Sequence, residues 1–152
     1  MLEDKINQDL KAALLGGDKV LVTTLRGLKS SLLYAKIASN SRDKTMPDEE
    51  VIAVFQKEAK KRQESADLYV QGGNHERAEA ELAEKAVISR YLPAQLADEE
   101  VMALVDDAIA TLAISGQPTM GAVISLVKTQ AAGRADGAQI ARIAKDRLET
   151  RA

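Results

Sequence analysis

Lysine and arginine side chains in three stretches of the sequence have the spacing to bind phosphate groups. In the first stretch, four bases along residues 19–36 would lie within an arc of about 100° if the segment is helical. Four more stand close together in residues 57–62, and from Lys128 onward six bases outnumber three acids. Cations aligned along a surface bind phosphates. The candidate nucleic-acid-binding residues are therefore Arg26, Lys29, Lys61, Lys128, Arg134, Arg142 and Lys145.

The turn Gly133–Gly137 leaves two interpretations of Arg134 open. Gly133 can end one helix in a left-handed conformation, and Asp136 can cap the next. Arg134 would then lie beside a helix N-terminus, where free N–H groups favour an anion. The structural alternative, which is favoured, is a tight turn in which Arg134 pairs with Asp136 or with the acidic stretch before it.

Two features count against strong RNA recognition. The chain has four aromatic residues, and Phe55, Tyr69 and Tyr91 are expected on packing faces, so base stacking would be minor and contact would be with the backbone. The bases of the first stretch could equally form a solvated face. In the second, Glu58–Arg62 and Lys60–Glu64 pairs would reduce the local positive charge.

Residues for catalysis are harder to find. The sequence has no Cys, and Ser30 and Ser31 follow Lys29 directly, so on a helix the lysine could not easily deprotonate either hydroxyl. These serines are better interpreted as small residues for helix packing. Glu81 and Glu84 share a helical face and are expected to form salt bridges with the long helix rather than act as acid and base. No catalytic residue, metal site or cofactor is predicted.

The composition predicts an all-α protein. Of 152 residues 45% are hydrophobic but only 3% aromatic, and residues that favour helices dominate. Helical spacing and Gly, Pro and Asn punctuation predict seven helices. Thr45–Asp48 resembles a capping box, and Asp98 is the candidate cap of the fifth helix. The predicted ranges are 2–15, 18–39, 47–71, 74–92, 98–114, 120–131 and 136–150.

A change in charge pattern indicates two domains. Residues 1–91 hold 15 basic and 15 acidic side chains, whereas residues 92–127 hold five acids and no base. The boundary is therefore placed at 91/92, between an N-terminal helical domain (1–91) with a long helix and a C-terminal three-helix bundle (92–152). There is no signal-peptide pattern and no apolar run of ~20 residues, so a cytoplasmic protein is expected.

Five short motifs occur in an order that resembles the GatB/YqeY family, specifically its stand-alone YqeY-like proteins. They are Gln63-Glu64-Ser65, Glu81-x-x-Glu84, Tyr91-Leu92-Pro93-x-Gln95-Leu96, Met120-Gly121-x-Val123 and Gly133-Arg134-Ala135-Asp136-Gly137. The resemblance spans nearly the whole chain. It implies an all-helical fold whose last part is similar to the tail of the GatB subunit of aspartyl/glutamyl-tRNA amidotransferase, a region associated with tRNA binding.

Three functions remain open at this point. The first is a non-catalytic module that contacts tRNA, or a complex that handles tRNA, through Lys and Arg. The second, suggested by the family's label, is carbon–nitrogen ligase activity with glutamine as the amido donor. The third is a protein–protein interaction module that uses the long helix.

Overall fold

The computed structural model describes residues 1–151, and these residues form seven α-helices and no strand. The predicted all-α class is confirmed. Most helix ends also lie within two residues of their predicted positions. The helices are α1 (Leu2–Gly16), α2 (Lys19–Ala38), α3 (Asp48–Gln71), α4 (His75–Ser89), α5 (Asp98–Ser115), α6 (Met120–Ala131) and α7 (Gly137–Arg151).

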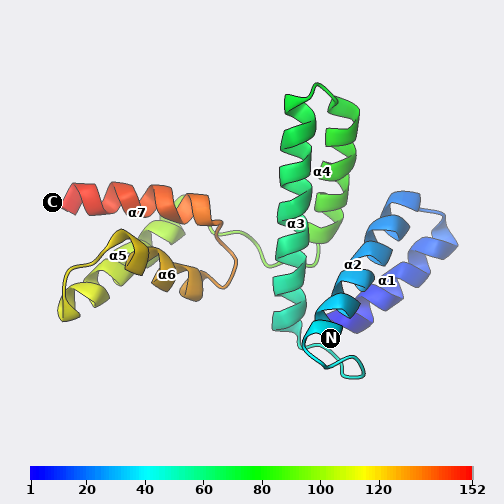
Figure 1. The fold of residues 1–152 in the computed structure, drawn as a ribbon, viewed down its shortest axis with the longest axis horizontal. Coiled ribbons are helices and arrows are strands. Elements are labelled where there is room, and N and C mark those ends of the chain that lie inside the picture. Colours follow the sequence, from blue (N-terminus) through cyan, green and yellow to red (C-terminus); the bar gives the residue numbers. More distant parts are fainter. Residues whose placement is uncertain (152) are drawn as a thin grey trace. The chain divides into compact units, whose positions relative to one another are not determined.

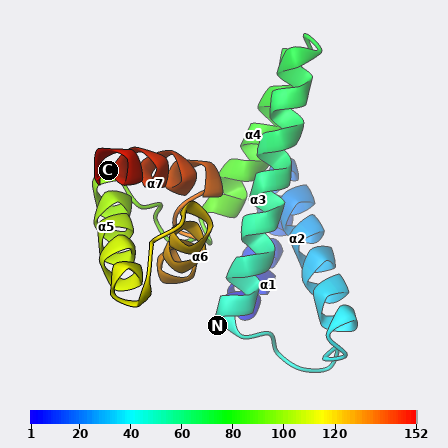
Figure 2. The ribbon, with the colours of Figure 1, turned by 60° about the vertical axis from the view of Figure 1, so that its left-hand side comes forward.

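The chain divides into two compact units, the first spanning Met1–Leu92 and the second beginning at Pro93. In the first unit α1 and α2 form a short antiparallel hairpin, and α3 and α4 form a longer one (Figures 1 and 2). The short hairpin packs beside the half of the long hairpin that lies away from the α3–α4 turn (Figure 1). The far half of the long hairpin therefore extends beyond α1 and α2.

The core of the first unit collects apolar side chains from all four helices around Phe55, which is fully buried. Tyr91, just after α4, packs its ring edge-on against Phe55 with the centroids 6.0 Å apart. Its hydroxyl donates a hydrogen bond to Asp9 of α1 over 2.5 Å. Burial, together with this carboxylate, raises the pKa of Tyr91, so its hydroxyl stays protonated and continues to donate.

The far half of the long hairpin is held together by small side chains. Ala66 and Ala78 are almost fully buried between α3 and α4. The turn uses Gly73 at φ 77°, a left-handed conformation that suits glycine. Asn74 then caps α4 by accepting a hydrogen bond from the Arg77 amide, as predicted.

The second unit is a three-helix arrangement in which α5, α6 and α7 all pack on one another (Figure 2). Its core is aliphatic, with Val101, Val105, Val123, Val127 and Ile140 fully buried. The segment before α5 lies against the α6–α7 turn, because the Leu96 amide donates to the Arg134 carbonyl over 2.7 Å.

Three local predictions about helix ends are wrong, and the first two fail for a related reason. Thr45 does not cap α3: Pro47 precedes the helix without a side-chain cap, and Asp48 accepts a hydrogen bond from the Leu2 amide instead. Asp98 does not cap α5, because its carboxylate binds Gln139 and Arg142 of α7. Both carboxylates are used in contacts between distant segments. The fourth helix ends at Ser89 rather than at Tyr91–Leu92.

Replacing Asp9 with alanine should lower the free energy of unfolding of the first unit by about 1 kcal/mol, because the Tyr91 hydroxyl loses a charged acceptor while Ala gains a little helix propensity. All three tyrosines lie in the first unit. Urea unfolding followed by the near-UV signal of tyrosine therefore reports on that unit alone. The exposed neighbour change Gln8→Ala is the control and should shift the transition much less; equal shifts would contradict the role given to Asp9.

Candidate nucleic-acid interface

Helix α2 presents an outer face with basic side chains and no carboxylate of its own. Its 20 residues contain four bases and no Asp or Glu. Arg26 and Lys29 are exposed, and neither takes part in an ion pair among the described residues. Lys36 differs from the other three, because it is mostly buried and forms an ion pair with Glu3 of α1. The predicted basic arc thus shortens to Lys19, Arg26 and Lys29.

The same outer face continues into an apolar end. Leu33, Tyr34 and Ile37 are 43%, 74% and 52% exposed. At ~100° per residue these three side chains lie on the same side of α2 as Lys19, Arg26 and Ser30. We call this surface, made of Lys19, Arg26, Lys29, Ser30, Leu33, Tyr34 and Ile37, the α2 face.

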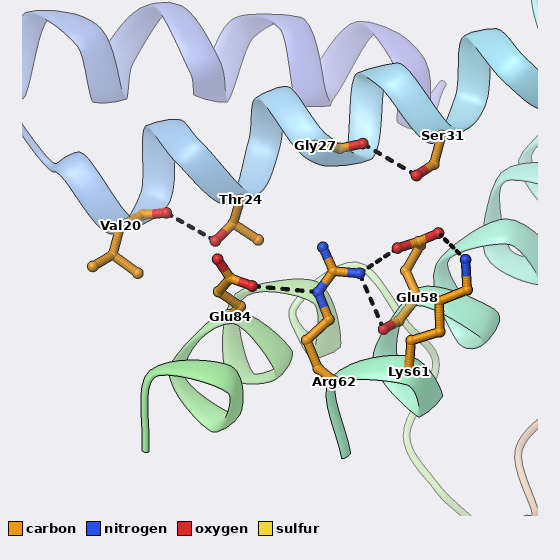
Figure 3. Close-up of polar contacts among 8 residues, drawn as sticks. All are labelled: Val20, Thr24, Gly27, Ser31, Glu58, Lys61, Arg62 and Glu84. Atoms are coloured by element: carbon orange, nitrogen blue, oxygen red, sulfur yellow. Dashed lines mark hydrogen bonds and ion pairs between the residues drawn. The ribbon is translucent and has the colours of Figure 1, made fainter. Parts of the chain in front are cut away.

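The inner side of α2 packs on a buried charge network (Figure 3). Arg62 of α3 forms ion pairs with Glu58 of the same helix and with Glu84 of α4, the latter over 3.4 Å. The guanidinium lies beside Gly27 of α2, where an added Cβ would stand 3.8 Å from Nη2. The predicted Glu58–Arg62 pair and the predicted ion pair of Glu84 with the long helix are thereby confirmed. Among the described residues the predicted Lys60–Glu64 pair and an ion pair of Glu81 do not form. The network joins α3 to α4 under the middle of α2.

Two opposing effects act on the carboxyl of Glu58. Burial raises its pKa, but the hydrogen bond from Arg62 and the charges of Arg62 and Lys61 outweigh burial, so the net pKa is lowered. Ser31, one of the two small residues expected to serve helix packing, donates to the Gly27 carbonyl over 3.1 Å. Lys61 reaches Glu58 over 3.4 Å, yet 69% of its side chain remains exposed. Lys61 thus lies at the rim of the network.

In the second unit, two arginines of α7 are joined to acids of α5. Arg142 pairs with Asp98 over 3.0 Å, and Arg147 pairs with Asp106 through two bonds of 2.8 Å. Hydrogen bonds from Gln139 and Arg142 lower the pKa of Asp98. The acidic stretch of α5 therefore offsets much of the positive charge that the sequence shows in α7.

The other candidates of this unit lie around the α6–α7 turn and along α7. Arg134 donates from Nε to the Ala94 carbonyl over 2.9 Å, and among the described residues it forms no ion pair with Asp136 or with the acidic stretch, so the pairing expected in the favoured arrangement is wrong. Anion binding by the other donors of Arg134 stays a prediction. Asp136 does accept from the Ala138 amide, as expected of a cap. Lys128 lies closest to the start of α7, because an added Cβ at Gly137 would stand 3.6 Å from its Nζ. Lys145 is exposed.

The structure thus groups Arg26 and Lys29 on one face of the first unit, places Lys61 on another helix of that unit, and distributes the other four candidates over the second unit. Sequence reasoning missed Tyr34 as an exposed ring. It also missed the absence of carboxylates throughout α2, which a count of charges per predicted helix would have revealed.

A cavity of about 410 Å³ lies between α1, the start of α2 and the residues after α4. It is lined by two bases, Lys5 and Arg90, and two acids, Asp9 and Asp18, and Asp9 is already bound to Tyr91. These balanced charges favour no single class of ligand. Within residues 1–151 no group of three or more His, Asp or Glu side chains is placed to hold a metal ion. None of the described helices has the length and apolar character to span a membrane.

Comparison with known proteins agrees with the motif pattern. The family model described as Yqey-like protein matches residues 3–148 of the chain. A search of curated proteins found no match to the chain.

Replacing Arg62 with methionine should lower the free energy of unfolding of the first unit by about 2 kcal/mol or more, because the change leaves Glu58 largely buried without its main partner. The double change Glu58→Leu with Arg62→Met removes both charges and should recover most of that loss. Urea unfolding followed by tyrosine near-UV signals provides the measurement. If the double variant is no more stable than Arg62→Met, the unpaired charge of Glu58 is not the cause of the lost stability.

The lowered pKa of Glu58 also predicts how the stability of the first unit depends on pH. Because the pKa of Glu58 is lower in the folded chain than its ordinary value of 4.5, its stabilising contribution is present above that pH and is lost as the pH falls below it. The wild-type chain should therefore lose more stability in acid than the Glu58→Leu, Arg62→Met variant. If the two proteins lose the same stability in acid, Glu58 is not the group that causes the pH dependence.

Proposed function

The chain belongs to the Yqey-like protein family, and from this premise we propose that it is a non-catalytic accessory module that binds tRNA, or a complex that handles tRNA, in support of tRNA-dependent amidotransferase function. Its resemblance to the GatB tail, carried by the Tyr91-Leu92-Pro93 and Gly133–Gly137 motifs, supports the tRNA connection. The α2 face supports binding.

The observation that carries the proposal is the uncompensated charge of the α2 face. Arg26 and Lys29 are exposed on a helix without a carboxylate, and within the described residues neither forms an ion pair. A net charge of −2 over the chain gives no general attraction to nucleic acid, so binding has to depend on such a local surface. Phosphates brought to it would release counterions, which is the main source of affinity in backbone contacts.

The second unit would add weaker contacts. Lys128 and Lys145 are exposed, whereas Arg142 would have to share its guanidinium with Asp98 and Arg134 uses one donor on Ala94. Lys61, with most of its side chain exposed at the rim of the buried network, is a further candidate. These residues would position the RNA backbone without reading its sequence.

The alternative of amide-nitrogen transfer from glutamine would require an activated nucleophile. Ser31 lies beside the charge network, yet its hydroxyl donates to the Gly27 carbonyl within its own helix. This interaction is typical of a packing residue. Formation of amide product by the pure protein from glutamine, ATP and misacylated Glu-tRNA or Asp-tRNA would favour catalysis over our proposal.

Binding to total tRNA should weaken steeply with salt, and reversing Arg26 and Lys29 to Glu should make the slope of log K against log salt shallower by about 1.4–1.8, because each lost phosphate contact removes roughly 0.7–0.9. Fluorescence anisotropy of labelled tRNA at several salt concentrations measures the slope.

The matched change in the second unit is Lys128 and Arg134 to Glu, which reverses the same number of charges. We expect a smaller effect, because Arg134 is already bound to Ala94. An unchanged slope after reversal of Arg26 and Lys29 would refute the α2 face as the contact surface. Absence of tRNA binding by the wild-type chain at low salt would refute the proposed function itself.

A further inference from the structure

We propose that the α2 face binds an unpaired stretch of RNA, with one base stacked on the ring of Tyr34 and the adjoining phosphates on Arg26 and Lys29. The inference rests on the proposed function and adds to it the kind of RNA element that is recognised, a single strand with accessible bases.

Tyr34 is the one aromatic ring of the described chain that is left largely open to solvent. Its side chain is 74% exposed, whereas Phe55 and Tyr91 pack edge-on against each other inside the core. Tyr69, the fourth ring, is half-buried and has the Arg77 guanidinium 5.8 Å from its centroid. An exposed ring next to cations is the arrangement that single-strand binding proteins use, since every base has a π face to stack.

The position of Tyr34 relative to the cations suits a strand that runs obliquely along the helix. Arg26, Ser30 and Tyr34 follow one another at intervals of four residues, which places them on one side of α2. At ~1.5 Å and ~100° per residue, Tyr34 lies about 12 Å along the axis and about 80° round the helix from Arg26. From Lys29 it lies about 7.5 Å along the axis and about 140° round the helix, so a bound strand would cross the helix obliquely. A stacked strand covers that length with about three nucleotides at ~3.4 Å each.

The apolar neighbours of Tyr34 are compatible with this use. Leu33 and Ile37 are about half exposed on the same helix face as the ring, so they would shield one edge of a stacked base from water. A duplex could meet the cations but could not offer a base to Tyr34, because its bases are already paired and stacked. A protein partner would have to bring an apolar patch and carboxylates together, whereas unpaired RNA carries negative charge and flat apolar surfaces throughout.

The chain has no tryptophan, so Tyr34→Trp introduces a single fluorophore on the α2 face. Titration with a short single-stranded RNA of mixed sequence should lower the fluorescence of this tryptophan, because a base stacked on the indole ring quenches its excited state. The control is Leu68→Trp, which places the same fluorophore at a position of 67% exposure on the far half of the α3–α4 hairpin. Its emission should stay nearly unchanged.

Affinity measurements with the same strand complete the test. Tyr34→Ala should weaken binding by about 5-fold or more, the loss that corresponds to the low end of base–aromatic stacking, while Tyr34→Phe should retain most of the affinity. Annealing the strand to its complement should remove the advantage of the wild-type chain over Tyr34→Ala. These changes lie on the solvent side of α2, so circular dichroism should show an unaltered fold.

The outcomes separate this inference from the proposed function. If tRNA binding is lost on reversal of Arg26 and Lys29 but single-stranded RNA binds Tyr34→Ala as well as wild type, stacking is refuted and the proposed function stands. If Tyr34→Ala leaves RNA affinity intact but dissociates a dimer in sedimentation, the occupant is a second copy of the chain and the inference is wrong. If the wild-type chain binds neither RNA, both proposals fail.

Discussion

The buried guanidinium of Arg62 is the interaction on which the arrangement of the first unit depends. A charge in this position is costly unless opposite charges and hydrogen bonds surround it, and Glu58 and Glu84 supply both from two helices (Figure 3). Arg62 also lies beside Gly27, so the network faces the inner side of α2. Leu25, Leu28 and Leu32 of α2 are buried with it. The opposite side of the helix must face water.

This orientation explains why the α2 face keeps its charge. Acids beside α2 are already engaged, since Glu58 and Glu84 pair with Arg62 and Glu3 pairs with Lys36. Asp18, just before the helix, caps its first turn. Arg26 and Lys29 project from the other side, where α2 has no carboxylate. Their field is therefore screened by solvent and salt alone. In the second unit the same residue types have a different effect, because Asp98 and Asp106 of α5 stand opposite Arg142 and Arg147.

Most of the fold could be predicted from the sequence because its signals are local. Glycine, proline and asparagine mark the helix ends, and Asp18 and Asn74 cap α2 and α4 as their positions suggest. The cap predictions that failed, at Thr45–Asp48 and at Asp98, concern residues whose carboxylates bind segments more than 40 positions away. A pattern that covers four residues carries no information about such partners.

The candidate site was less predictable, since its character depends on exposure and on which charges are neutralised. Helical spacing places Tyr34 on the side opposite Leu25 and Leu28, but it does not give the exposure that remains after the other helices have packed. Two arrangements of Arg134 were open from its turn, and neither includes the contact that forms, a hydrogen bond from Nε to the carbonyl of Ala94, 40 positions earlier. Counting cations therefore overestimates the positive field of α7, where Arg142 and Arg147 are paired, more than that of α2, where Lys36 is the one paired base. A surface attracts phosphate in proportion to the charge left after the fold has formed its ion pairs, and in this chain that remainder is greatest where the helix sequence contains no acid.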